Sequence, residues 1–81
     1  MFKLRKNVHI SIGDIMRIKI LVKDVRARKN ITLAKLSDKT GISKTHINDI
    51  ENNLKEPSLS IMVRLAKGLD VDLNELYKVI W

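Results

Sequence analysis

The sequence predicts a small all-α domain, a bundle of five short helices, preceded by an N-terminal arm that forms a β-strand or a β-hairpin. Three observations lead to this prediction. The chain has 81 residues, 44% of them hydrophobic and none of them cysteine, which suits one core without disulfides. Its apolar residues alternate up to residue 22 and then change to helical spacing. Residues that begin and end helices recur at short intervals after that point.

Residues 1–19 are predicted to form a basic arm that contains β-strands. Even positions from Val8 to Val22 are apolar with the exception of Asp14, and this is the period of a strand. Gly13 and Asp14 favour a turn, so we expect strands over roughly 7–12 and 16–22. A loop over 13–15 would pair Ile10 with Ile18. Because an isolated hairpin is marginal in water, it must pack on the helices or pair with another copy of the chain.

Residues 20–81 are predicted to form the five helices. The first helix carries Val22 and Val25 and ends near Asn30, a residue type that tolerates the left-handed conformation. Good N-terminal caps mark the starts of the other four helices, at Thr32, Ser43, Ser58 and Asp72. Gly41 ends the second helix, and Pro57 separates the third from the fourth. We expect Leu73, Leu76 and Tyr77 of the fifth helix to face inward.

The stretch TLAKLSDKTGISKTHINDIENN, residues 32–53, has the spacing of a helix-turn-helix motif. Ser37 supplies the small residue where the two helices cross, and Gly41 supplies a turn residue that can take positive φ. Ile42, Ile47 and Ile50 supply the apolar contacts between the helices. Each feature alone is common, but together at these offsets they predict that the second helix of the pair enters the major groove of DNA.

The polar face of this second helix suits contacts with DNA. Asn can bond adenine in two places, Thr can touch a thymine methyl, and Lys can reach guanine or phosphate. The predicted base contacts are Lys44, Thr45, His46, Asn48 and Asp49. The predicted phosphate contacts are Thr32, Ser43, Asn52 and Lys55. The competing interpretation is a merely solvated helix face, which the spacing of the helix pair disfavours.

Residues 20–78 resemble the Xre family, the phage-repressor-like helix-turn-helix domains of bacterial regulators. The resemblance is carried by VKDVRARKNITLAKLSDKTGISKTHINDIEN, by the Pro-Ser before the fourth helix and by LAKGLDVDLNELY. It implies a five-helix bundle that binds double-stranded operator DNA as a homodimer, with the third helix in the major groove. It also implies a structural ion pair between Arg26 and Glu51. The N-terminal strands and residues 77–81 are the candidate dimer interfaces.

The chain departs from the family pattern at three points. Leu33 replaces the usual Gln that contacts phosphate or base, and Asn30 and Asn53 replace glycines. The charge is also uneven, since residues 1–29 hold nine Lys or Arg against two Asp, whereas residues 30–81 are electroneutral. The basic arm and first helix would therefore supply most of the attraction to DNA.

The sequence predicts a transcriptional regulator, and a repressor in preference to an activator. It predicts no enzymatic activity. The alternative is a protein-interaction module, such as an antitoxin-like partner, which Leu33 and the neutral bundle favour. His9 and His46 have no ligand-spaced partners, so we expect no metal, and no motif indicates a cofactor. The absence of a secretory signal and of a membrane-length apolar run predicts a cytoplasmic location.

Overall fold

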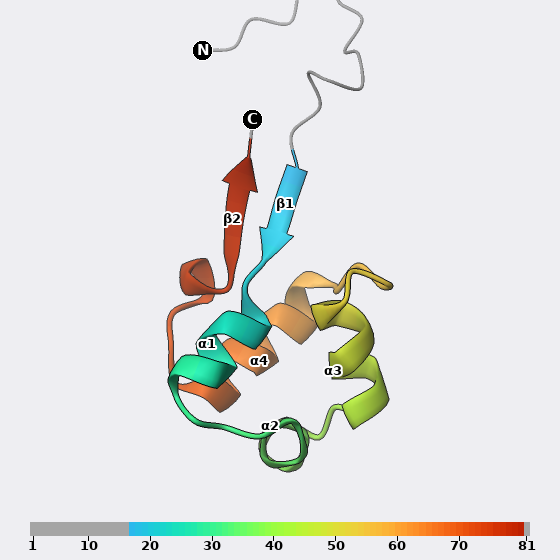
Figure 1. Ribbon diagram of the computed structural model, residues 1–81, viewed down its shortest axis with the longest axis vertical. Helices are drawn as coiled ribbons and strands as arrows, with labels where there is room; N and C mark the ends of the chain where they lie inside the picture. Colours follow the sequence, from blue (N-terminus) through green and yellow to red (C-terminus); the bar gives the residue numbers. More distant parts are fainter. Residues whose placement is uncertain (1–16, 81) are drawn as a thin grey trace, which may run out of the picture.

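Four α-helices and a two-stranded ribbon make up residues 17–80, the part of the chain that the computed structural model describes. The elements follow in the order β1 (Arg17–Ile20), α1 (Val22–Arg28), α2 (Leu33–Thr40), α3 (Lys44–Glu51), α4 (Leu59–Leu69), η2 (Leu73–Glu75) and β2 (Tyr77–Ile80). The ribbon projects from one end of the helical body, α2 lies at the opposite end, and α3 forms one side (Figure 1). None of the described helices combines the length and the apolar character that crossing a membrane requires.

The ribbon joins the two ends of the described chain. β1 pairs with β2 in antiparallel orientation, and the Leu21 N–H donates to the Leu76 carbonyl at 2.7 Å where the ribbon meets the helices. The register is Arg17 with Ile80, Ile18 with Val79, Lys19 with Lys78 and Ile20 with Tyr77. Since side chains alternate along a strand, one face of the ribbon is apolar and the other carries Arg17, Lys19 and Lys78 together with Ile80. The strand predicted over 16–22 contains β1, while its predicted partner over 7–12 lies outside the described residues.

The buried core of the described residues consists of aliphatic side chains and one methionine. Its buried residues are Val22, Val25, Leu36, Ile42, Ile47, Ile50, Met62, Leu65, Ala66, Leu69 and Leu76. Ile31 and Leu33 are half-buried and pack against them. Among the described residues no polar or charged residue belongs to the buried core, although the side chain of Glu51 is only 2% exposed. The core thus binds α2, α3 and α4 into one body, with α1 and Leu76 closing it.

Side-chain caps fix the starts of α2, α3 and α4, as predicted. The hydroxyl oxygens of Thr32, Ser43 and Ser58 each accept a hydrogen bond from the backbone N–H three residues later, at 3.0, 3.1 and 3.1 Å. Each bond satisfies an N–H group that has no partner within the helix. These caps are local, so they depend on the sequence alone.

A residue with left-handed backbone follows each of the four helices, and three of these residues are not glycine. Asn30, Asn53 and Asp70 have φ of 57°, 61° and 57°. In each case the next residue bonds back across the last turn, from Ile31 to Arg26, from Leu54 to Asp49 and from Val71 to Ala66. This is the Schellman pattern. Asn30 and Asn53 thus take the conformation predicted for them, while Asp70 was not foreseen.

The helical class is confirmed, but the predicted fifth helix is wrong. Asp72 does form the capping-box contact, its N–H donating to Glu75 Oε2 at 3.0 Å, but the helix that follows is a three-residue 3₁₀ turn. Leu76 is buried as predicted, whereas Tyr77 is 36% exposed and begins β2. The alternating residues from Tyr77 to Ile80 satisfy their backbone groups on β1 instead of in a helix. The domain is therefore mostly helical, with a small sheet.

Candidate nucleic-acid interface

The turn between α2 and α3 is held by its own side chains. Gly41 has φ of 74° and ends α2, as predicted. The Ser37 hydroxyl donates to the Ile42 carbonyl at 2.6 Å, which explains why a small residue stands there. The Thr40 hydroxyl donates to the Leu36 carbonyl at 2.8 Å and accepts from the Ile42 N–H at 3.2 Å. These bonds set the direction in which α3 leaves the turn.

Ile42, Ile47 and Ile50 anchor α3 to the body. Ile47 and Ile50 are completely buried and Ile42 is 3% exposed. Because the two α3 residues lie three apart, they occupy one side of the helix and leave the opposite side free. The predicted apolar contacts of the motif are thus all present.

The free side of α3 carries the residues that the sequence predicts for DNA contact. Lys44, Thr45 and Asn48 are exposed, and His46 and Asp49 are half-buried. The predicted phosphate contacts Thr32, Ser43, Asn52 and Lys55 are all exposed. Thr32 and Ser43 already use their hydroxyl oxygens as caps, so each offers its hydroxyl proton and the nearby backbone N–H groups to an anion. All of these residues except Thr32, which caps α2, thus lie on α3 or beside its two ends.

Asn48 and Asn52 form a pair that the sequence analysis did not foresee. They lie one turn apart on α3 and its C-terminal cap, and Asn52 Nδ2 donates to Asn48 Oδ1 at 3.2 Å. This bond orients the Asn48 amide and leaves its NH₂ group free to donate. Asn52 thus has a second role available beside phosphate contact.

Arg26 of α1 and Glu51 of α3 form the ion pair that the family resemblance implied, and its geometry is bidentate. Arg26 Nε donates to Glu51 Oε2 at 2.8 Å and Nη2 donates to Oε1 at 3.1 Å, while Nη1 donates to the Ile31 carbonyl at 3.1 Å. The side chains are 17% and 2% exposed. The hydrogen bond to Glu51 raises the pKa of Arg26 above its ordinary value, although burial opposes this, so the guanidinium stays charged. It fixes the last turn of α3 against α1.

Arg64 and Gly68 of α4 contact α2 of the motif, and the sequence analysis foresaw neither contact. Arg64 Nη2 donates to the Thr40 carbonyl at 2.7 Å, at the C-terminal end of α2. Gly68 faces the side chains of Leu36 and Thr40 at the α2–α4 contact. No sequence signal marks either, because a single Arg or Gly inside a helix does not reveal which neighbour it meets.

The model of the helix-turn-helix family matches residues 22–76, which is more than half of the chain. The match spans every helix described above, from the start of α1 to Leu76. The chain belongs to the Xre-like helix-turn-helix family. The predicted family is therefore confirmed.

Relatives of this helix-turn-helix domain include phage and bacterial regulators. It is 33% identical over 63 residues to the ImmF control region 10 kDa protein of Bacillus phage phi105, covering 78% of this chain and 70% of that protein. It is 32% identical over 56 residues to the HTH-type transcriptional regulator SinR of Bacillus subtilis, covering 68% of this chain. The match spans half of SinR's length, since it covers 50% of that protein.

Solved structures agree with this fold. The N-terminal DNA-binding domain of SinR superposes with a TM-score of 0.60 at 31% identity, covering 65% of this chain and 78% of that one. A protein from Bacteroides fragilis superposes with a TM-score of 0.67 at 31% identity, covering 79% of this chain and 100% of that one.

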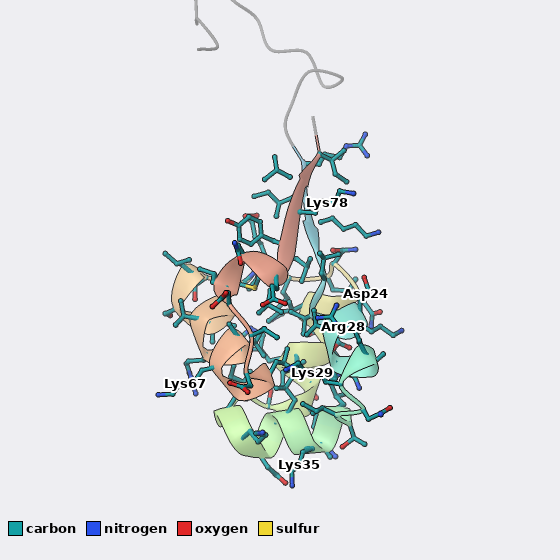
Figure 2. The ribbon with its side chains drawn as sticks, turned by 90° about the vertical axis from the view of Figure 1, so that its left-hand side faces the viewer. Asp24, Arg28, Lys29, Lys35, Lys67 and Lys78 are labelled. Atoms are coloured by element: carbon teal, nitrogen blue, oxygen red, sulfur yellow. The ribbon has the colours of Figure 1, made fainter. Side chains whose placement is uncertain are left out.

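Two basic residues at the end of α1 in this helix-turn-helix domain, Arg28 and the cap residue Lys29, lie away from α3 (Figure 1, Figure 2). Arg28 lies 3.7 Å from Glu75, and Lys29 Nζ donates to the Asp70 carbonyl at 3.2 Å. Both lie on the side shown in Figure 2, which is opposite α3 in Figure 1. Arg28 and Lys29 therefore contact the segment after α4 and do not lie beside the exposed side of α3.

Within residues 17–80 no three His, Asp or Glu side chains come together in a way that could hold a metal ion. Helix-turn-helix regulators are typically not enzymes.

Proposed function

We propose that this chain is a transcriptional regulator, acting as a repressor, that binds a short operator in double-stranded DNA with α3 in the major groove. One observation carries the proposal. The exposed side of α3 presents Lys44, Thr45 and Asn48, while the buried side is anchored by Ile47 and Ile50. A helix held in this way can enter the groove without rearrangement.

The two relatives that are named as regulators support the regulatory role. One is called a transcriptional regulator and the other a control region protein. Since helix-turn-helix proteins gain affinity from two half-sites, we propose that the chain acts as a homodimer on a palindromic operator. This activity belongs in the cytoplasm, and it calls for no cofactor and no metal.

Base contacts in this proposal come from Lys44, Thr45, His46, Asn48 and Asp49. Phosphate contacts come from the two capped helix ends, at Thr32 and Ser43, and from Asn52 and Lys55 after α3. Phosphate contacts position the protein, and contacts to base edges select the sequence.

Selection of bound sequences from a random pool of duplex DNA tests the proposal. We expect a palindromic consensus whose half-sites are separated by about one helical turn, 10 base pairs, or a multiple of it. Binding should also weaken steeply as salt rises, because phosphate contacts release counterions. A pool that yields no consensus would overturn the proposal.

A second candidate function is a protein-interaction module with little DNA binding. It is favoured by the charges of residues 30–81, which cancel, and by Leu33, which packs against the core instead of presenting a polar group. Binding to duplex DNA that is weak and nearly independent of salt would support this candidate over the first.

A further inference from the structure

Two hydrogen bonds join Asn48 of α3 to its C-terminal cap, Asn52. The Asn52 backbone N–H donates to the Asn48 backbone carbonyl at 3.0 Å, and Asn52 Nδ2 donates to Asn48 Oδ1 at 3.2 Å. Both residues are exposed, and they lie one turn apart, outside the buried side that Ile47 and Ile50 form. The pair therefore lies on the surface of α3 that would meet DNA.

The backbone around Asn52 is held by the end of the helix. The next residue, Asn53, has left-handed backbone with φ of 61°. The Leu54 N–H then donates to the Asp49 carbonyl at 2.8 Å, which closes the last turn of α3. Because these bonds fix the backbone, the Asn52 amide stays within reach of Asn48, and little conformational entropy is lost when a partner covers the pair.

The side-chain bond decides which atoms of Asn48 remain for a base. An amide side chain accepts through its oxygen and donates through its nitrogen. Asn48 Oδ1 already accepts from Asn52, whereas Asn48 Nδ2 has no hydrogen-bond partner among residues 17–80. In this orientation Asn48 therefore meets a base as a donor.

The edge of guanine in the major groove suits a donor best. Guanine presents two acceptors side by side, O6 and N7, whereas adenine presents N7 beside its N6 amino group, which is a donor. Thymine presents one acceptor, and cytosine presents a donor. The two-point contact of an asparagine with adenine needs Oδ1 as the acceptor for N6, and Asn52 already donates to that oxygen of Asn48.

We propose that Asn48 reads guanine in each operator half-site, and that Asn52 is the positioning residue that favours guanine over adenine. The inference rests on the proposed function and names one base of the DNA that α3 would bind. Asn52 Nδ2 carries a second hydrogen, which is left for a phosphate oxygen. One side-chain amide can thus contact the DNA backbone and orient the residue that reads the base.

Selection of bound sequences from random duplex DNA, carried out with the full chain and with Asn48→Ala, locates the base pair that Asn48 reads. It is the position at which the variant loses its preference. We expect guanine there in the wild type, and replacing that G·C pair by A·T should raise Kd about tenfold. Substituting 7-deazaguanine, which lacks the N7 acceptor, should also raise Kd. Unchanged circular dichroism shows that the variant folds.

Asn52→Asp tests the positioning role. A carboxylate cannot donate, so the Asn48 amide must turn and donate to it, which leaves Oδ1 for the base. We expect the preference at that position to change from guanine toward adenine or cytosine, whose amino groups donate. The measured quantity is the ratio of Kd values for duplexes that differ only at this base pair, because the added charge weakens binding to all duplexes alike.

Asn74→Asp is the matched control for Asn52→Asp. Asn74 is exposed in η2, so this variant adds the same charge outside α3. Its base preference should equal that of the wild type. A change of preference in the control as large as that in Asn52→Asp would assign the effect to charge and overturn the positioning role.

Three further results would overturn the inference: a base other than guanine at the position that Asn48→Ala relaxes, no position that this variant relaxes, or an unchanged preference for guanine in Asn52→Asp. Each of them leaves the proposed function intact, because the wild-type chain still selects a sequence. A wild-type chain that selects no sequence would overturn the proposed function, and this inference with it.

Discussion

Gly68 of α4 packs against Thr40 of α2 so closely that a Cβ on Gly68 would lie 2.5 Å from the Thr40 methyl carbon, Cγ2. That methyl belongs to the residue whose hydroxyl holds the turn before α3. The glycine therefore lets α2 and α4 approach, and the approach positions the helix proposed to enter DNA.

Replacing Gly68 with alanine should destabilise the domain, although alanine favours a helix over glycine by about 1 kcal/mol. The new Cβ would also lie 3.1 Å from Leu36 Cδ1, so the Thr40 and Leu36 side chains, or α2 with them, must shift. We expect a loss of about 1–3 kcal/mol in the free energy of unfolding, measured in urea. Thr40→Ser removes the clashing methyl but keeps the hydroxyl, so the double variant should regain most of that loss. An alanine variant as stable as the wild type would contradict the close packing.

Glu51→Ala should destabilise the fold strongly. It would leave the Arg26 guanidinium, which is 17% exposed, without its carboxylate. Breaking a buried pair on one side costs about 3 kcal/mol. Chemical denaturation measures this loss.

Arg28→Ala is the control for the Glu51 variant. The Arg28 and Glu75 side chains are 61% and 45% exposed, so losing their contact should cost less than about 1 kcal/mol. Equal losses in the free energy of unfolding would show that the Arg26–Glu51 pair stabilises the fold no more than the exposed Arg28–Glu75 contact does.

Replacing Thr45, His46 and Asn48 with alanine should remove sequence selectivity while leaving circular dichroism unchanged. Thr45 and Asn48 are exposed and His46 is half-buried, so none of them supports the core. Competition between the selected operator and random duplex DNA measures the effect. Retained selectivity would refute the base contacts assigned to α3.

Asn52→Ala should reveal whether Asn52 positions Asn48. A residue that only contacts phosphate weakens binding to all sequences alike. Loss of the 3.2 Å bond to Asn48 should in addition relax the preference at one base pair of each half-site. A repeated selection with this variant distinguishes the two outcomes, and an unchanged consensus would leave Asn52 with the phosphate role alone.

Asp70→Asn should stabilise the domain. Asp70 ends α4 in left-handed conformation, where the unpaired carbonyl groups carry partial negative charge. Asparagine tolerates the same backbone without the carboxylate charge, so we expect a gain of about 0.5 kcal/mol at low salt. Thermal unfolding at two salt concentrations checks this, because the gain should shrink as salt rises. A gain that is independent of salt would contradict the electrostatic cause.

The sequence by itself determined the helix starts and most of the helix ends. Thr32, Ser43 and Ser58 cap the helices they were predicted to cap, and Gly41, Asn30 and Asn53 take positive φ where predicted. These features depend on hydrogen bonds between residues no more than five apart, so a short stretch of sequence contains all of their partners. The polar side of α3 follows in the same way from the spacing of Ile47 and Ile50.

Only the tertiary structure decided that residues 17–20 pair with residues 77–80 and that α4 supports the helix-turn-helix motif. Alternation along β1 shows that a strand forms and which face is apolar, but it does not identify β2 as a partner, because any strand with a matching face could pair there. Residues 77–80 form a strand because they pair with β1, and they do not extend a helix. Arg64 and Gly68 likewise gain their roles from α2, which lies far away in sequence and is brought to them only by the packing of the core.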